Sequence, residues 1–326
     1  MRRVTTIAEI REAVAAARGD GDTVALVPTM GALHEGHLAL VREAATRADT
    51  VVVSIFVNPA QFDRTDDLDG YPRDLDGDEA ALAALGDAAP DLVFAPEAEE
   101  VYPRPRLTTV TVAELSDRLC GASRPGHFDG VATICTKLFS IVQPDLAVFG
   151  RKDFQQLQII RRVVADLDLP VTIVGAPTFR DPDGLAMSSR NQRLDAGERR
   201  AALGLSRALR AGVAVARAAR ASGQPFDPVR VREEVTGILT SVPGVTIDYV
   251  EVLDPESLDE SPATTEGPPL DAKPREQAST DAPGTTERDD QRRLVAVAAH
   301  VGPVRLIDNV VLGDREDEER LLAATD

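Results

Sequence analysis

Two histidines three residues apart, His34 and His37, stand where an apolar segment, residues 24–27, gives way to a helical pattern that begins at Leu38. The backbone N–H groups at a helix start are unpaired, and the helix dipole adds partial positive charge, so such a corner accepts phosphate. Imidazole can donate a hydrogen bond to phosphate without a permanent charge. The pattern therefore predicts a phosphate-binding corner. A zinc site is disfavoured because no further ligands with suitable spacing lie nearby, whereas a pair of surface histidines remains an alternative.

A second cluster, Gly150-Arg151-Lys152-Asp153, also follows a buried strand and opens a helix. The Lys152 ammonium can reach nucleotide phosphates, and the Asp153 carboxylate can accept hydrogen bonds from both hydroxyls of a ribose. Gly150 lets the backbone approach a ligand closely. Taken alone, the segment also fits an ordinary helix start with an acid in its first turn.

A third cluster, Met187-Ser188-Ser189-Arg190, lies in a loop before the next helical pattern. Two hydroxyls followed by a guanidinium suit a polyphosphate, because the planar fork of arginine spans two oxygens. A helix N-cap with serines is the alternative.

Two further loops carry polar side chains. Residues 58–62 offer the amides of Asn58 and Gln61, and residues 124–130 contain His127. The fourth histidine, His300, lies in a strand-like run and is expected to be structural. Asp78 stands on a helical pattern and is a candidate magnesium ligand by position alone.

The elements that carry these clusters alternate between strand and helix over residues 1–180, which predicts an α/β fold with a doubly wound, parallel, Rossmann-like sheet. Ligands bind such sheets at the carboxyl ends of the strands. The loops at residues 28–37, 58–62, 150–153 and 177–181 follow four of these strands. We therefore expect them to converge on one crevice.

Residues 181–326 predict a second, smaller α+β domain that serves as a lid. Two helices are expected at residues 195–220 and 229–239, and strands at 245–253, 294–300 and 304–310. Between these strands, residues of about 256–290 are rich in Pro, Thr, Asp and Glu and lack an apolar period. Such a composition predicts a disordered insertion.

Composition narrows the function classes. A net charge of −18 argues against a nucleic-acid partner. No segment approaches the roughly 18 apolar residues of a membrane span, and no apolar signal region follows Met1. Cys120 and Cys135 do not form a Cys-x-x-Cys pair and predict buried, reduced thiols. We expect a cytoplasmic protein that does not bind membranes.

The histidine pair matches the His-x-Gly-His signature of the nucleotidyltransferase superfamily, and the serine loop is similar to its Lys-Met-Ser-Lys-Ser loop. In order along the chain stand Pro-Thr-Met-Gly-Ala-Leu-His-Glu-Gly-His, Phe-Val-Asn-Pro-x-Gln-Phe, Arg-Pro-Gly-His-Phe-x-Gly-Val, Phe-Gly-x-Lys-Asp-x-Gln-Gln and Met-Ser-Ser-Arg-Asn. Over residues of about 20–255 and 294–309, this set resembles the pantothenate synthetase family, the ATP-dependent pantoate–β-alanine ligases.

The resemblance implies that ATP, with Mg²⁺, activates pantoate as pantoyl adenylate and releases pyrophosphate, after which β-alanine displaces AMP to give pantothenate. It also implies a homodimer. The residues implied in catalysis contact the triphosphate: His34, His37, Lys152, Ser188, Ser189 and Arg190. The residues implied in ATP binding are Pro28, Thr29, Met30, His37, Phe149, Gly150, Lys152, Asp153, Phe179, Met187, Ser188, Ser189 and Arg190. Met30, Gln61 and Gln156 are implied for pantoate, and Asn58 for β-alanine.

One residue departs from the family pattern, because Arg151 stands where glutamate is usual.

Two other functions compete with this interpretation. A cytidylyl- or adenylyltransferase would stop at nucleotide transfer and need no amine, and a nucleotide-binding regulatory protein would have lost phosphate-contacting residues that are all present here. A tRNA synthetase is disfavoured by size, acidity and the lack of an anticodon-binding extension.

Overall fold

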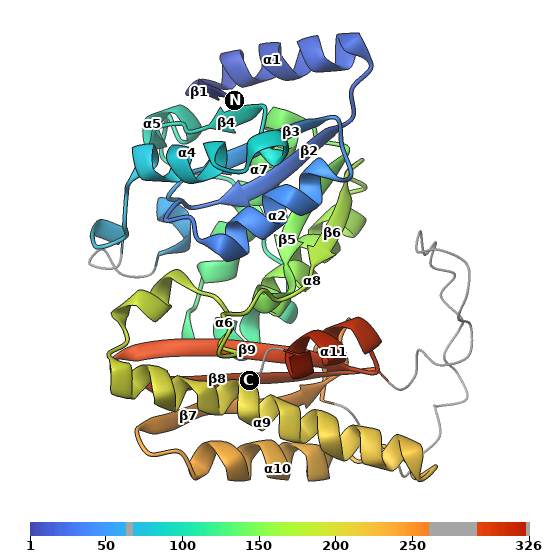
Figure 1. The fold of residues 1–326 in the computed structure, drawn as a ribbon. Coiled ribbons are helices and arrows are strands. Elements are labelled where there is room, and N and C mark those ends of the chain that lie inside the picture. The colour runs from blue at the N-terminus through green and yellow to red at the C-terminus, as the bar shows by residue number, and fades with distance from the viewer. Residues whose placement is uncertain (63–67, 261–291, 324–326) are drawn as a thin grey trace. The chain divides into compact units, whose positions relative to one another are not determined.

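The computed structural model describes residues 1–62, 68–260 and 292–323, and the chain divides into two compact units (Figure 1). The first unit comprises residues 1–181 and 186–193, and the second comprises residues 182–185 and 194–326. A boundary expected at residue 180 would have put the Met187–Arg190 motif in the second domain. The chain instead returns after residue 185, so that all five motifs belong to the first unit.

The first unit is built on a six-stranded, fully parallel sheet with the order β1-β4-β3-β2-β5-β6. This confirms the predicted doubly wound fold. The strands are β1 (Arg2–Val4), β2 (Val24–Thr29), β3 (Thr50–Ile55), β4 (Leu92–Phe94), β5 (Leu146–Gly150) and β6 (Thr172–Ala176).

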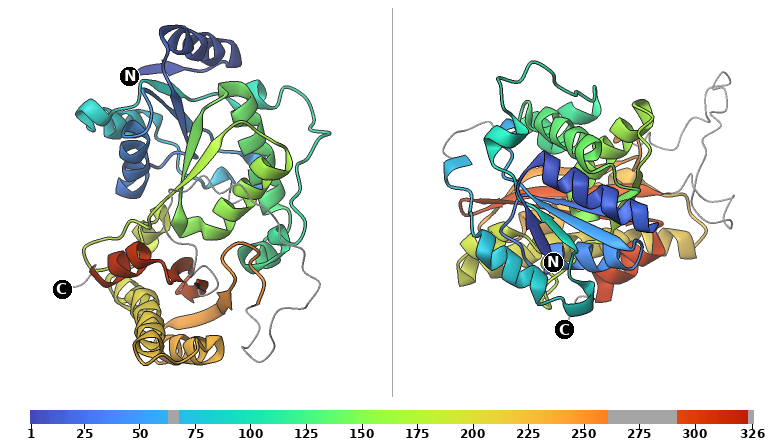
Figure 2. Two further views of the ribbon diagram at one scale, coloured as in Figure 1. Left: turned by 90° about the vertical axis from the view of Figure 1, so that its right-hand side faces the viewer. Right: turned by 90° about the horizontal axis from the view of Figure 1, so that it is seen from above.

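Helices cover both faces of this sheet. They are α1 (Ile7–Asp20), α2 (Glu35–Ala45), α4 (Leu75–Ala83), α5 (Ala98–Val101), α6 (Leu119–Ser123), α7 (His127–Val142) and α8 (Phe154–Asp166). Helices α2 and α4 lie on one face, and α7 and α8 lie on the other (Figure 2). Alternate strand residues such as Ala25, Val27 and Val53 share one buried cluster with Val41 of α2 and Leu82 of α4. The near-continuous apolar strands thus bury both of their faces.

The strand order reverses beside β2. Its neighbour on one side is β3, which follows it along the chain, whereas its neighbour on the other side is β5, which comes after a long crossover. Such a reversal separates the loops that leave the two strands and opens a crevice at their carboxyl ends. Here the loops that flank the reversal are the His34–His37 corner after β2 and the Lys152–Asp153 corner after β5.

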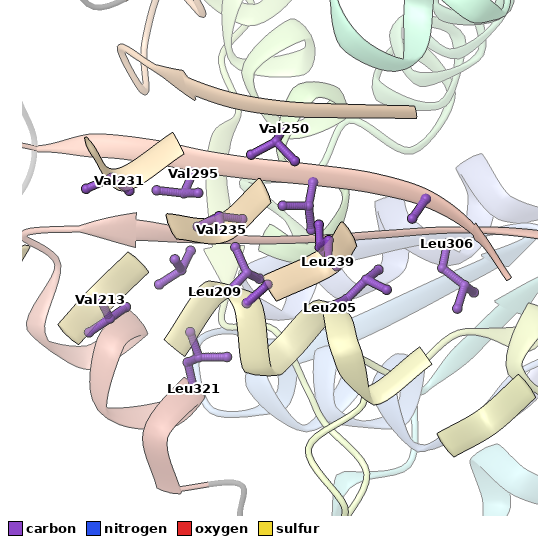
Figure 3. Packing of buried hydrophobic residues seen from close by; sticks show 14 of the residues in the cluster. Leu205, Leu209, Val213, Val231, Val235, Leu239, Val250, Val295, Leu306 and Leu321 are labelled. Carbon is purple, nitrogen blue, oxygen red and sulfur yellow. The ribbon is translucent and has the colours of Figure 1, made fainter. Parts of the chain in front are cut away.

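The second unit packs helices on a three-stranded antiparallel sheet of the order β7-β8-β9. Its elements are α9 (Ala196–Ala221), α10 (Pro228–Thr240), β7 (Val245–Leu253), β8 (Arg293–Val301), β9 (Val304–Leu312) and α11 (Arg315–Ala323). Leu209 of α9, Val235 of α10 and Val295 of β8 meet in its core (Figure 3). The core is separate from that of the first unit, as expected for an independent α+β unit.

Several elements differ from the sequence expectations. Residues 124–130, expected as a loop, contain the start of α7, which begins at His127 directly after Gly126 with its positive φ of 78°. Elements β1, α1 and α11 were not anticipated. Residues 254–260, where the insertion was expected to start, form a turn that buries Leu258. The rest of the predicted insertion lies outside the described residues.

Among the described residues, no helix is both long enough and apolar enough to cross a bilayer.

Candidate active site

The loops at the carboxyl ends of β2, β3, β5 and β6 line one pocket of the first unit. Every residue that the sequence assigned to catalysis, ATP, pantoate or β-alanine lies in its wall. These residues are Pro28, Thr29, Met30, His34, His37, Asn58, Gln61, Phe149, Gly150, Lys152, Asp153, Gln156, Phe179, Met187, Ser188, Ser189 and Arg190. Asp78 does not line the pocket.

The start of α2 is capped by its own two histidines. The Nδ1 atom of His34 accepts a hydrogen bond from the backbone N–H of Gly36 at 3.1 Å, and Nδ1 of His37 accepts one from the N–H of His34 at 3.4 Å. This is the reciprocal pattern of a capping box, with imidazoles in place of the usual Ser and Glu. Because an accepting Nδ1 carries no proton, the proton of each neutral ring sits on Nε2. Both rings are therefore fixed as Nε2–H donors.

Gly36 is required by this arrangement. A Cβ atom at position 36 would lie 2.9 Å from Cε1 and 3.0 Å from Nδ1 of His34. The two imidazole rings lie 4.1 Å apart between centroids. The glycine of the His-x-Gly-His motif thus gives the first ring room to fold back over the helix start.

Both imidazoles are held neutral. Burial lowers the pKa of His37 to about 3, and the neighbouring His34 adds to this shift. Burial, followed by the charge of Lys152, also lowers the pKa of His34. Neutral rings with fixed tautomers suit the predicted role, because they donate hydrogen bonds to an anion without the cost of a buried positive charge.

The second corner supplies the charges. Lys152 Nζ lies 3.8 Å from Asp153 Oδ2. Removal from water raises the pKa of Asp153, but Lys152 and Arg190 outweigh this effect and the pKa ends below its ordinary value. The imidazole pair and this lysine–aspartate corner line the same pocket.

The serine motif is held against the end of β6. The N–H of Met187 donates to the carbonyl of Phe179 at 2.9 Å, and the Ser188 hydroxyl accepts the N–H of Arg190 at 3.3 Å. The Ser189–Arg193 segment continues as a short 3-10 turn. Hydroxyl and guanidinium groups thereby enter the pocket on the same loop.

A buried amide network fixes Gln61. Asn58, which is 1% exposed, accepts the N–H of Ala60 at 3.2 Å and donates to the carbonyl of Gly130 at 3.1 Å. These backbone partners set which side of the amide is oxygen, so Asn58 Nδ2 donates to Gln61 Oε1 at 3.0 Å. The Gln61 Nε2 group is then the one that faces Met30, with 2.7 Å to its sulfur.

The polar atoms of Asn58 are all engaged, because its Oδ1 also accepts the Tyr102 hydroxyl at 3.0 Å. Asn58 therefore orients Gln61, and contact with β-alanine stays a prediction.

The two glutamines at the start of α8 diverge. Gln156 lines the pocket. Gln155 instead donates to the carbonyls of Leu115 and Arg118 at 2.8 and 2.6 Å. Successive helix residues point about 100° apart, so only one of the pair can face the ligand. Arg151 points away from the pocket wall and donates through Nε to the carbonyl of Gly175 at 3.0 Å.

Several pocket residues had no role assigned from the sequence, among them Tyr71 and Arg124. An apolar wall is formed by Phe56 and by one stripe of α7, namely Val131, Ile134, Cys135 and Leu138. The i, i+3, i+4, i+7 spacing of this stripe is present in the sequence, but the same spacing is equally typical of an ordinary hydrophobic core.

The two cysteines differ in burial. Cys135 is buried as expected, whereas Cys120 is only half-buried. Burial raises the pKa of the Cys135 thiol to about 12.

His127 supports Gln61 from the backbone side. Its Nδ1 lies 2.8 Å from the carbonyl oxygen of Gln61, and its Nε2 lies 3.3 Å from a guanidinium nitrogen of Arg124. A carbonyl only accepts and a guanidinium only donates, so the ring must be neutral with its proton on Nδ1. Burial, aided by the charge of Arg124, lowers the pKa of His127 to about 4.

Asp78 contacts the backbone of the turn between β2 and α2. Its two carboxylate oxygens accept the N–H groups of Ala32 and Leu33 at 3.0 and 2.7 Å. Throughout residues 1–62, 68–260 and 292–323, no three His, Cys, Asp or Glu side chains gather as a metal site. Both oxygens of Asp78 accept backbone N–H groups, and a contact with magnesium stays a prediction.

Comparisons with known proteins agree on one family. A sequence profile of the pantoate-beta-alanine ligase family matches residues 2–311. A pantothenate synthetase of Geobacter sulfurreducens is 46% identical over 316 residues, which cover 97% of this chain and all of the relative. One from Myxococcus xanthus is also 46% identical, over 97% of this chain and 98% of its own.

Solved structures give the same result. The crystal structure of pantothenate synthetase from Thermus thermophilus has a TM-score of 0.78 at 40% identity and covers 95% of this chain and 99% of its own. A pantoate-beta-alanine ligase from Francisella tularensis, complexed with beta-gamma ATP and beta-alanine, has a TM-score of 0.69 at 28% identity, over 95% of this chain and 97% of its own.

The neutral state of His127 predicts an acid-dependent loss of stability. Its pKa is about 4 in the folded protein against 6.5 ordinarily, so the unfolded chain binds the proton first and stability falls as the pH drops from about 6.5 towards 4. Between about pH 7 and pH 5, protonation of this group alone should lower the free energy of unfolding by on the order of 1–2 kcal/mol. In urea unfolding, the free energy of unfolding of His127→Gln should fall less over this pH interval than that of the parent protein. His300→Gln, at an exposed position of β8, should lose as much as the parent, and an equal loss in all three proteins would contradict the assignment.

Proposed function

The chain belongs to the pantoate-beta-alanine ligase family, and from this membership we propose that it condenses pantoate with β-alanine to pantothenate at the expense of ATP. The observation that carries the proposal is the single pocket in which five separate motifs meet. That pocket combines neutral donors, fixed cations, oriented amides and an apolar wall, which are the groups that these substrates require.

The chemistry dictates two steps. A free carboxylate is a poor acyl donor, because an oxide ion would have to leave. Attack of the pantoate carboxylate on the α-phosphorus of ATP gives pantoyl adenylate and pyrophosphate, and converts that oxygen into part of a phosphate leaving group. The β-alanine amine then attacks the acyl carbon, and AMP departs with the electron pair of the broken C–O bond.

The triphosphate would lie between the two corners of the pocket. The Nε2–H groups of His34 and His37 would donate to phosphate oxygens from one side. Lys152, the hydroxyls of Ser188 and Ser189, and the guanidinium of Arg190 would face it from the other. Catalysis of the first step is then positioning plus stabilisation of the charge that develops on the phosphates.

The nucleoside would extend from the same phosphates. The Asp153 carboxylate, kept ionised by Lys152 and Arg190, would accept the ribose hydroxyls, and Gly150 would leave room for the sugar. Met187 and the backbone of Phe179 would flank adenine. The remaining contacts assigned to ATP come from Pro28, Thr29, Met30 and Phe149.

Pantoate has both a polar and an apolar side, and the pocket has a wall for each. Gln61 Nε2 and the amide of Gln156 would hold its carboxylate and hydroxyl oxygens, with Met30 beside them. The two methyl groups suit the stripe of α7 that includes Val131 and Leu138. Neutral amides orient the carboxylate without an ion pair, and so leave its charge available for attack.

Magnesium would enter as MgATP. Mg²⁺ is commonly held by substrate phosphates together with one or two carboxylates, and the described residues offer no closed protein cage for it. Its charge would assist the departure of pyrophosphate.

Three wider expectations accompany the proposal. The use of ATP favours a cytoplasmic enzyme, and the family resemblance implies a homodimer, which sedimentation would test. The lid role of the C-terminal unit stays a prediction.

Product analysis tests the proposed function. Incubated with ATP, Mg²⁺ and pantoate, the protein should form enzyme-bound pantoyl adenylate and release pyrophosphate. Addition of β-alanine should give pantothenate and AMP in equal amounts, as identified by mass spectrometry. Nucleotide transfer that does not depend on β-alanine would indicate a nucleotidyltransferase. If ATP is not converted under any of these conditions, the result would indicate a nucleotide-binding protein without catalytic activity.

Removal of one phosphate donor should slow the first step. Loss of a single well-placed donor typically costs about 10²–10³ in rate, and we expect this loss for His37→Ala and for Lys152→Ala in pantoate-dependent pyrophosphate release. His300→Ala provides a matched control at an exposed histidine and should retain full rate. A decrease of less than about tenfold in both site variants would show that their roles are misassigned.

The fixed amide polarity of Gln61 also makes a prediction. Gln61→Glu replaces the Nε2 donor with a carboxylate oxygen, which would repel the pantoate carboxylate. We expect the KM for pantoate to rise at least about tenfold, the effect of roughly 1.4 kcal/mol, while the KM for ATP changes little. Gln224→Glu, at an exposed position, is the control. An unchanged KM for pantoate would place this substrate elsewhere in the pocket.

A further inference from the structure

The turn between β2 and α2 has an unusual backbone. Gly31 and Ala32 are successive residues with positive φ, 80° and 52°. A non-glycine residue in this region costs free energy and persists only where the surroundings hold it. Here the turn directs the N–H groups of Ala32 and Leu33 towards one carboxyl group. Successive N–H groups aimed at one point form a nest, a concavity that binds anions.

An anion from the protein itself fills this nest. Asp78, in the first turn of α4, is 5% exposed, and each of its oxygens takes one N–H, at 3.0 Å from Ala32 and 2.7 Å from Leu33. The fit is close, because a Cβ atom at Gly31 would lie 2.8 Å from Asp78 Oδ2. A glycine at position 31 therefore both adopts the positive φ and leaves room for the carboxylate.

The nest leads directly into the histidine cap. His34 follows Leu33, and its backbone N–H donates to Nδ1 of His37 while its ring accepts the N–H of Gly36. The direction of the chain at Leu33 thus sets where both imidazoles stand. A shift of the turn would move the two Nε2–H donors together.

We propose that Asp78 is a positioning residue for the adenylation step, and that its carboxylate is the built-in anion of the turn that aims His34 and His37 into the pocket. It does not touch the substrates. It also keeps the nest from competing with the histidines for the phosphates of a nucleotide. The effect on rate rests on the proposed function, whereas the effect on the imidazoles does not.

Removal of the carboxylate should therefore be reversible by a small anion. In Asp78→Ala the nest is vacated, and pantoate-dependent pyrophosphate release should fall by about 10²-fold, the size of loss that a misplacement of about 1 Å produces. Formate has the size of the missing group and should restore much of the rate, whereas acetate, which carries an extra methyl group, should restore less. Formate should not raise the rate of the parent protein.

A matched control lies two residues earlier in the sequence. Asp76 lies in the same first turn of α4 with its side chain 98% exposed, and Asp76→Ala should keep the parent rate with or without formate. The imidazole signals of His34 and His37 in NMR give a readout that needs no turnover. They should shift in Asp78→Ala, return with formate, and stay in place in Asp76→Ala.

A second variant covers the case in which Asp78→Ala does not fold. Asp78→Asn keeps the volume of the side chain but places an amide donor against a backbone N–H. Its rate of pyrophosphate release should therefore fall by a similar factor, and formate should not restore it. The proposal would be overturned if either variant kept the parent rate. It would also be overturned if Asp78→Ala were slow but showed unchanged imidazole signals and no response to formate. If the parent makes no pantothenate, the NMR experiment still decides the role of Asp78, so the two failures are distinguishable.

Discussion

The reciprocal cap at the start of α2 is the interaction on which the rest of the site depends. A helix start leaves N–H groups that must find acceptors, and here the acceptors are the Nδ1 atoms of His34 and His37. The same bonds that satisfy the backbone fix the tautomer and direction of both rings. Helix capping and the predicted substrate contacts therefore use the same two rings, and a Cβ atom at Gly36 would crowd the His34 ring.

The sheet topology decides what faces this cap. Because the strand order reverses between β2 and β5, the loops that leave these strands border one crevice. Lys152 and Asp153 arrive there from more than a hundred positions away in the sequence, and Gln61 arrives at the end of β3. The overall charge of −18 has little bearing on the site, since a few cations in a partly dehydrated pocket act over short distances and are weakly screened.

The site is arranged in two layers. Groups assigned to the substrates face the pocket, and a second set of side chains holds them in position. Asn58 and His127 hold the side chain and the backbone of Gln61, and Asp78 holds the turn before the histidines. Buried polar groups are costly unless paired, and each member of the supporting layer makes at least one hydrogen bond to the backbone. This pairing keeps the facing groups rigid before any substrate arrives.

The sequence by itself determined the parallel α/β fold, the order of the motifs and the identity of most pocket residues, because periodicity and local motifs are carried by neighbours along the chain. It did not separate the α7 stripe from ordinary core, and it did not show that Asp78 accepts the N–H groups of Ala32 and Leu33. It also divided the chain before the Met187–Arg190 loop, which belongs with the other motifs. Each of these outcomes depends on which groups meet across long sequence separations, and hydrogen-bond direction and burial are fixed only when the chain has folded.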